Sequence, residues 1–249
     1  MPRPLRYSLD IFRGEVRLKA ILVFAFEQPV QRMDELASDL LGPSEAAYFS
    51  TLSSARRQNS YLLGRYAAKL ALKDALSEPD LRSIEIVRGV FEQPIVQYRR
   101  TGGWGVTISH TDSLAVGLAY PAGHPMGVDV ERIDRAGQEA ILSQLSPQEI
   151  DWIDSSADDR DTVATALWAA KEALSKVLTT GLMSPVRIYN LSEFSQIDSG
   201  MWEGLFENFA QYKVRVWVGS SYALSIAMPK KSMIGHCSYF CAALCSQCG

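Results

Sequence analysis

The sequence predicts an α+β fold made of two similar halves, each with helices grouped beside mainly antiparallel strands. Residues 66–72 and 168–174 share five of seven residues at an offset of 102. Two further matches, at offsets of 104 and 108, pair residues 41–45 with 145–149 and residues 115–121 with 223–229. Three matches in the same order along the chain indicate an internal repeat rather than chance.

A short helix is predicted in each half, starting at a Leu-x-Pro-x-Glu type element, because proline suits the first turn and an acid suits the helix dipole. Longer helices with buried Ala and Leu are predicted at 55–77 and 160–179. Segments rich in β-branched residues predict strands at 16–26, 83–90, 95–98, 104–109 and 114–119, then at 127–131, 186–189, 212–218 and 223–227. Helices grouped beside runs of strands favour α+β over a βαβ series.

A Pro/Gly cluster at residues 121–125 is typical of a linker. We therefore expect an N-terminal half at 1–122, a C-terminal half at 123–232 and a tail at 233–249. The tail holds all four cysteines, Cys237, Cys241, Cys245 and Cys248, preceded by His236. Zinc or cluster binding there is one interpretation. The simpler one is a terminal helix with cysteines along one face, or a frayed tail that the activity does not need.

The composition excludes several classes of protein. A chain of 249 residues, 47% of them hydrophobic, can bury a substantial core. A formal net charge of −3 does not favour nucleic acid as a partner. No apolar run reaches the roughly 18 to 20 residues of a membrane span, and the apolar run at 21–26 is too short and too far in for a signal peptide. We expect a cytoplasmic protein.

Two short segments carry the chemistry. In a strand, side chains two apart share a face, so Asp129 and Glu131 point the same way. In a helix, residues four apart share a face, so Trp168, Glu172 and Lys176 form one stripe. The plain interpretation is solvated surface charge, but both segments are otherwise apolar, and charge on a partly buried element needs partners. The three carboxylates can therefore converge on one cation, as in a phosphate-transfer site.

The repeat shows where the halves differ. Leu70 stands where the second half has Glu172, so the first half lacks this carboxylate. One half can therefore be catalytic, while the other is free to bind.

Residues 127–131 (Gly-Val-Asp-Val-Glu) and 168–176 (Trp-x-x-Lys-Glu-x-x-x-Lys) resemble the paired signatures of the Sfp-type 4′-phosphopantetheinyl transferases. Three lesser elements occur in the family's order: Arg56-Arg57 leading to Gly64-Arg65, Gln93-Pro94, and Ile108-Ser109-His110. The resemblance spans roughly residues 15 to 230. It implies a two-lobed protein whose halves form a pseudo-two-fold dimer, and we expect a monomer because the repeat replaces a true dimer.

The resemblance also implies an activity. Such enzymes move the 4′-phosphopantetheine arm of coenzyme A onto a serine of an apo acyl, peptidyl or aryl carrier protein, releasing adenosine 3′,5′-bisphosphate. By resemblance, Asp129, Glu131 and Glu172 hold Mg²⁺, with Mn²⁺ as a substitute, and Glu172 and Lys176 are catalytic. The implied coenzyme A contacts are Arg56, Arg57, Arg88, Gln93, Pro94, Ser109, His110, Lys171 and Lys176.

The sequence departs from the family pattern on the nucleotide side. Glu45, Tyr48 and Gln93 stand at places that are often basic, which predicts fewer cations near the nucleotide. Arg56, Arg57, Arg65 and Lys69 are the candidates to compensate.

Other classes of function fit less well. A serine hydrolase would need Ser109 to use His110 as its base, but neighbours in a strand point to opposite faces, and no Gly-x-Ser-x-Gly element is present. The glycines at 102–105 lack the lysine of a phosphate-binding loop. The main alternative is a catalytically weak module of the same fold that binds coenzyme A or a carrier protein.

Overall fold

The computed structural model describes residues 4–27, 33–98, 103–235, 237 and 239–245. The chain forms two compact units, Met1–Pro125 (unit 1) and Met126–Gly249 (unit 2). Both combine helices with antiparallel strands, which confirms the predicted α+β class with two halves. The units divide directly after the Pro/Gly cluster, between Pro125 and Met126. No helix in the described part of the chain is long and apolar enough to cross a membrane.

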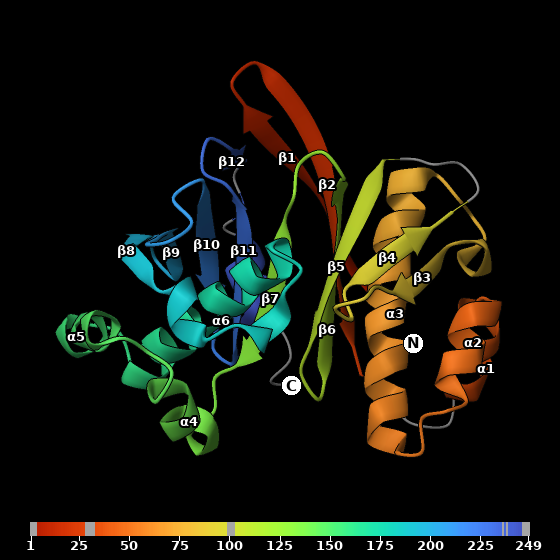
Figure 1. The fold of residues 1–249 in the computed structure, drawn as a ribbon, viewed down its shortest axis with the longest axis horizontal. Coiled ribbons are helices and arrows are strands. Elements are labelled where there is room, and N and C mark those ends of the chain that lie inside the picture. Colours follow the sequence, from red (N-terminus) through yellow and green to blue (C-terminus); the bar gives the residue numbers. More distant parts are fainter. Residues whose placement is uncertain (1–3, 28–32, 99–102, 236, 238, 246–249) are drawn as a thin grey trace. The chain divides into compact units, whose positions relative to one another are not determined.

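Unit 1 is built on an antiparallel sheet in the order β1-β2-β6-β5, with the long helix α3 packed against β2, β6 and β5 (Figure 1). A separate hairpin joins β3 to β4. Its elements are β1 (Leu5–Arg13), β2 (Val16–Phe26), α1 (Met33–Leu40), α2 (Pro43–Phe49), α3 (Ala55–Leu76), η2 (Leu81–Ser83), β3 (Glu85–Arg88), β4 (Pro94–Gln97), β5 (Trp104–His110) and β6 (Leu114–Pro121).

Unit 2 carries a five-stranded antiparallel sheet in the order β7-β11-β10-β9-β8, with α6 packed across β7, β11 and β10 (Figure 1). Its elements are β7 (Gly127–Arg132), η3 (Arg135–Gly137), α4 (Gln138–Leu142), α5 (Pro147–Ser155), α6 (Arg160–Val177), η4 (Gly181–Met183), η5 (Val186–Tyr189), β8 (Leu191–Asp198), β9 (Met201–Phe206), β10 (Tyr212–Val218), β11 (Tyr222–Pro229), β12 (Met233–Ile234) and α7 (Tyr239–Cys245).

The strand registers give a residue-level match between the units. β5 and β10 begin and end 108 residues apart, and so do β6 and β11. Gly117 on β6 pairs with Val23, and Ser225, 108 residues further on, pairs with Asp129. Val23 on β2 is therefore the counterpart of Asp129 on β7.

Several predicted elements were wrong in kind or extent. Residues 186–189 form the 3-10 helix η5 instead of a strand. Pro185 precedes this turn with φ of −54°, and the Tyr189 hydroxyl donates to Gly181 O, so proline geometry and tertiary contact override β-branched propensity. Strands β1, β8 and β9 and helix α1 were missed. Most of β8 is exposed, and an edge strand with a polar outer face lacks clear alternation.

The C-terminal segment contains the terminal helix of the simpler interpretation, α7, and packs on unit 2. Helix α7 packs against β10 and β11. The Phe240 ring is fully buried and meets Trp217 edge-on, with ring centroids 5.1 Å apart. Cys237 is buried as well, and the Cys241 thiol donates to Gly200 O. His236 and Cys248 lie outside the described residues.

Candidate functional site

Strand β7 and helix α6 bring the predicted acidic side chains together within unit 2. Residues 127, 129 and 131 all lie on the face of β7 that packs against α6, because alternate residues of a strand share a face. Gly127 allows this contact, because a Cβ there would lie 2.0 Å from Ala173 O. With no side chain at Gly127, α6 lies close enough to β7 for its polar stripe to reach the carboxylates.

The contacts between this strand and helix follow the predicted stripe. Lys176 Nζ donates to Asp129 Oδ1 at 2.7 Å, and Trp168 Nε1 donates to Glu131 Oε1 at 3.3 Å. Glu172 lies between Trp168 and Lys176 on the helix and acts electrostatically on Glu131. We call Asp129, Glu131 and Glu172 the carboxylate cluster.

Two acids of the carboxylate cluster have raised pKa values. Burial raises the pKa of Glu131 to about 7, helped by Asp129 and Glu172 and opposed by Lys176. Burial likewise raises the pKa of Glu172 to about 7, with Asp129 adding to the shift and Lys176 opposing it. Three acids therefore share one nearby lysine, and further positive charge would favour their ionised forms.

The donor set fits a hard divalent cation. Carboxylate oxygens are the ligands that Mg²⁺ and Mn²⁺ prefer, and a bound cation would relieve the repulsion among the acids. In the described part of the chain, no three His, Cys, Asp or Glu side chains are already arranged as a metal site. Lys176 instead supplies the positive charge beside Asp129. The cluster is thus a chemically suitable site that would have to rearrange around an ion.

Lys171 is not placed to bind a cofactor, contrary to the prediction from the family signature. Its side chain is fully buried, and its Nζ lies 2.7 Å from Glu149 Oε2 and 2.9 Å from Asn190 Oδ1. Three polar groups, the third being Gln144 O, already surround this ammonium. The Lys-Glu pair of the signature therefore combines a buried structural lysine with a glutamate of the carboxylate cluster.

Unit 1 contains a basic pocket of about 820 Å³ formed by α2, α3, β3 and β5. Four of the predicted nucleotide-side residues meet there: Arg56, Arg57, Arg88 and His110. An adjoining hollow of about 230 Å³ includes Pro94 and shares Arg88 and His110. The other lining residues of the larger pocket are Tyr48, Leu52, Ser54, Ser60, Tyr61, Thr111 and Asp112.

Two predicted contacts, Gln93 and Ser109, are not among the residues that line the basic pocket or the adjoining hollow. The Gln93 side chain accepts from Phe91 N at 2.9 Å and lies against Gly89, so it stabilises the β3–β4 turn. Ser109 is buried and sits beside His110 on β5, where consecutive side chains point to opposite faces. His110 therefore lines the pocket while its neighbour points away.

Tyr48 is a pocket residue that sequence reasoning treated only as a missing cation. The guanidinium carbon of Arg88 lies 4.3 Å from the centre of its ring, a cation–π geometry that positions the arginine. Arg88 also pairs with Glu92, and Arg56 pairs with Asp112. An aromatic residue directly before a helix end was the available signal, although such residues usually belong to the core.

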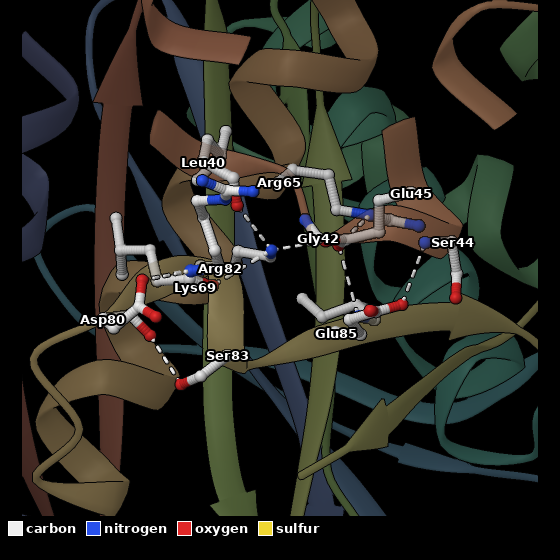
Figure 2. Close-up of polar contacts among 12 residues, drawn as sticks. Leu40, Gly42, Ser44, Glu45, Arg65, Lys69, Asp80, Arg82, Ser83 and Glu85 are labelled. Carbon is white, nitrogen blue, oxygen red and sulfur yellow. Dashed lines mark hydrogen bonds and ion pairs between the residues drawn. The ribbon is translucent and has the colours of Figure 1, made fainter. Parts of the chain in front are cut away.

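Glu45 and Lys69 pair with each other, so Lys69 is not among the cations of the basic pocket. Figure 2 shows them joined beneath α2, where both side chains are buried. Arg65 Nε lies 3.3 Å from Glu45 Oε1, with its guanidinium over the Tyr61 ring at 4.6 Å. This buried acid therefore holds Lys69 and also pairs with Arg65, which lines the adjoining hollow.

An α+β fold with a carboxylate cluster and a separate basic pocket defines a candidate for metal-assisted phosphate transfer. Residues 125–227 match the model of the 4′-phosphopantetheinyl transferase superfamily. The matched region contains the carboxylate cluster and Lys176. Over this region the match agrees with the superfamily that the sequence motifs predict.

Two solved structures are similar to part of the chain. A holo-(acyl-carrier-protein) synthase from Bacillus anthracis, in complex with CoA (3′,5′-ADP), is 20% identical, with a TM-score of 0.37, over 46% of this chain and 96% of its own. A holo-ACP synthase from Plasmodium yoelii is 17% identical, with a TM-score of 0.33, over 47% of this chain and 95% of its own. At this similarity neither assigns a role to a residue. A comparison with curated protein sequences finds no match.

Proposed function

We propose that this protein transfers the 4′-phosphopantetheine arm of coenzyme A to a serine hydroxyl of an apo carrier protein. The observation that carries the proposal is the carboxylate cluster facing Lys176, inside the region that matches the superfamily. The partner supplies the nucleophile, so the enzyme needs charge neutralisation, a base and a binding site for the nucleotide.

Asp129, Glu131 and Glu172 are the proposed ligands of Mg²⁺ or Mn²⁺. When bound, the ion would neutralise charge on the pyrophosphate and on the departing bisphosphate. Lys176, now held by Asp129, is the proposed cation for a phosphate oxygen. An ammonium with one carboxylate partner keeps donors available for a second anion.

Glu172 is the proposed general base for the carrier serine, acting directly or through a water. In the metal-free protein burial raises its pKa to about 7, and a bound cation would favour the ionised form, which is the form that accepts a proton. Glu131 has a similarly raised pKa, but its Oε1 accepts the Trp168 indole hydrogen, which restrains it. This difference favours Glu172 as the group that exchanges a proton.

The basic pocket of unit 1 is the proposed site for the nucleotide end of coenzyme A. Arg56, Arg57, Arg88 and His110 provide donors for phosphate oxygens, and Tyr48 and Tyr61 provide aromatic faces for a purine ring. Pro94 borders the adjoining hollow. The proposed enzyme acts as a monomer in the cytoplasm, on carriers of fatty acid, polyketide or nonribosomal peptide synthesis.

The proposal is tested by incubating the protein with coenzyme A, Mg²⁺ and apo acyl, peptidyl or aryl carrier proteins, and measuring the intact mass of each carrier. We expect one phosphopantetheine added per carrier, only with Mg²⁺ or Mn²⁺ present. Comparing the initial rates ranks the carrier classes. Coenzyme A binding without a mass gain on any carrier would instead support the catalytically weak binding module.

A further inference from the structure

Lys171 and Glu149 form the centre of a buried polar contact set in unit 2. Lys171 Nζ is held by Glu149 Oε2, Gln144 O and Asn190 Oδ1, at 2.7, 3.2 and 2.9 Å. Glu149 also accepts from Leu191 N at 3.0 Å. We call this set the Lys171–Glu149 hub. It connects α6 to the segment before α5, to α5 itself and to the start of β8.

Unit 1 contains the same arrangement around Lys69 and Glu45 (Figure 2). Lys69 Nζ contacts Glu45, Leu40 O at 2.6 Å and Leu81 O at 3.1 Å. Glu45 accepts from Ile86 N at 3.2 Å, as Glu149 does from the first residue of β8. Two halves with few other identities have thus kept one buried ion pair in the same place.

The residue that follows each lysine separates the two hubs. In unit 1 it is Leu70, a core residue, so that hub serves the fold alone. In unit 2 it is Glu172 of the carboxylate cluster. Adjacent residues on a helix point about 100° apart, so the group that fixes Lys171 also fixes the direction of Glu172.

Helix α6 is held from its strand side as well. Ser225 Oγ donates to Ala169 O at 2.5 Å, and Gly127 lies directly under Ala173 O. These contacts set the distance of α6 from the sheet. The hub holds the same helix at Lys171 from another side, through α5 and the start of β8.

We propose that Lys171 and Glu149 are positioning residues for the carboxylate cluster, holding Glu172 where it can share a cation with Asp129 and Glu131. This inference rests on the proposed function. Neither residue contacts the ligand, because both side chains are fully buried. Ligand-orienting groups of this kind change metal affinity as well as stability.

The two hubs provide a matched experiment. The double variant Lys171→Met/Glu149→Gln removes the ion pair of unit 2 without leaving an uncompensated buried charge, and Lys69→Met/Glu45→Gln does the same in unit 1. Mn²⁺ affinity of the free protein is measured by calorimetry, and stability by urea unfolding. We expect similar losses in urea midpoint, but only the unit 2 variant should bind Mn²⁺ about 10- to 100-fold more weakly.

Further variants separate this inference from the proposed function. If wild type and Glu172→Gln bind Mn²⁺ equally, the proposed metal site itself is wrong. If Glu172→Gln weakens binding while the unit 2 hub variant does not, or if both hub variants weaken it equally, the positioning role is overturned. Should the double variant fail to fold, Asn190→Ala removes one acceptor of Lys171. A smaller loss of Mn²⁺ affinity is then expected, and an unchanged affinity would contradict the inference.

Discussion

The two units share a scaffold but distribute charge in opposite ways. In unit 2 the strand and helix that meet carry Asp129, Glu131, Glu172 and Lys176. By register and offset, the corresponding residues of unit 1 are Val23, Ala25, Leu70 and Asp74. The first three are buried in the core, and Asp74 is paired with Arg6.

The basic pocket shows the reverse difference. Arg56 and Arg57 open α3 in unit 1, whereas Asp158 and Asp159 stand 102 residues further on, before α6. Asp159 caps that helix by accepting from Thr162 N. Similar backbones thus carry a basic pocket in one unit and a carboxylate cluster in the other. Comparison of the two units therefore distinguishes residues that both units use to support the fold from residues that are candidates for chemistry in one unit.

Removing the acid that unit 1 lacks should have the largest effect. Glu172→Gln keeps the size of the side chain but loses a metal ligand and the proposed base. Loss of metal stabilisation costs several kcal/mol, so transfer should fall at least about 1,000-fold at tenfold per 1.36 kcal/mol. Intact-mass rates measure it, with the exposed Glu193→Gln as control. Near-normal activity of Glu172→Gln would show that the acid is neither ligand nor base.

Helix α7 has no counterpart at the end of unit 1. Its buried residue Phe240 therefore tests how much this addition contributes to the stability of unit 2. Phe240→Ala should lower the free energy of unfolding by about 3 to 5 kcal/mol, because a buried aromatic ring leaves a cavity. Urea unfolding measures it, and the exposed Met233→Ala is the matched change outside the core. Truncation before Gly235 should cost soluble protein. A truncated chain of normal stability would restore the interpretation as a dispensable tail.

The carboxylate cluster should make the metal-free protein less stable as the pH rises. Glu131 and Glu172 keep their protons up to about pH 7 in the folded state, against 4.5 for an ordinary glutamate. Between these values the folded state binds more protons than the unfolded state, so the free energy of unfolding falls by several kcal/mol. Thermal melts in a chelator from pH 4.5 to 8 measure it. Glu172→Gln should flatten the fall of melting temperature with pH, and added Mn²⁺ should reverse it. A melting temperature that rises with pH in the chelator would contradict the raised pKa values of the carboxylate cluster.

The smallest effect is expected at the surface of the basic pocket. Arg56 and Asp112 are largely exposed, with side-chain exposures of 78% and 69%, so Asp112→Asn should change stability by less than about 1 kcal/mol. Coenzyme A should bind more tightly, by less than about fivefold, because the pocket loses a negative charge. Calorimetry measures the coenzyme A affinity of the wild type and of the variant, with Asp154→Asn in unit 2 as control. Weaker binding would show that Asp112 orients Arg56.

Sequence reasoning worked where periodicity and local contacts decide the structure. The long helices, the strand beginning at Gly127 and the repeat follow from spacings of two and four residues, which the backbone imposes on any chain. It failed where a tertiary partner decides. Residues 186–189 have strand propensity, yet Pro185 and the Tyr189 hydroxyl hold them in a turn. Likewise, burial by Trp217 turns the cysteine segment into part of the core.

The sequence by itself determined the two-fold repeat, the acidic strand and the stripe of Trp168, Glu172 and Lys176. Only the tertiary structure decided which of the neighbouring charges are available for chemistry. Lys171 and Glu172 are adjacent and equally charged in magnitude, but the helix turns the first into a buried ion pair and the second toward β7. Sequence spacing specifies the direction of a side chain on its own element, whereas its availability depends on the partners that other elements place around it.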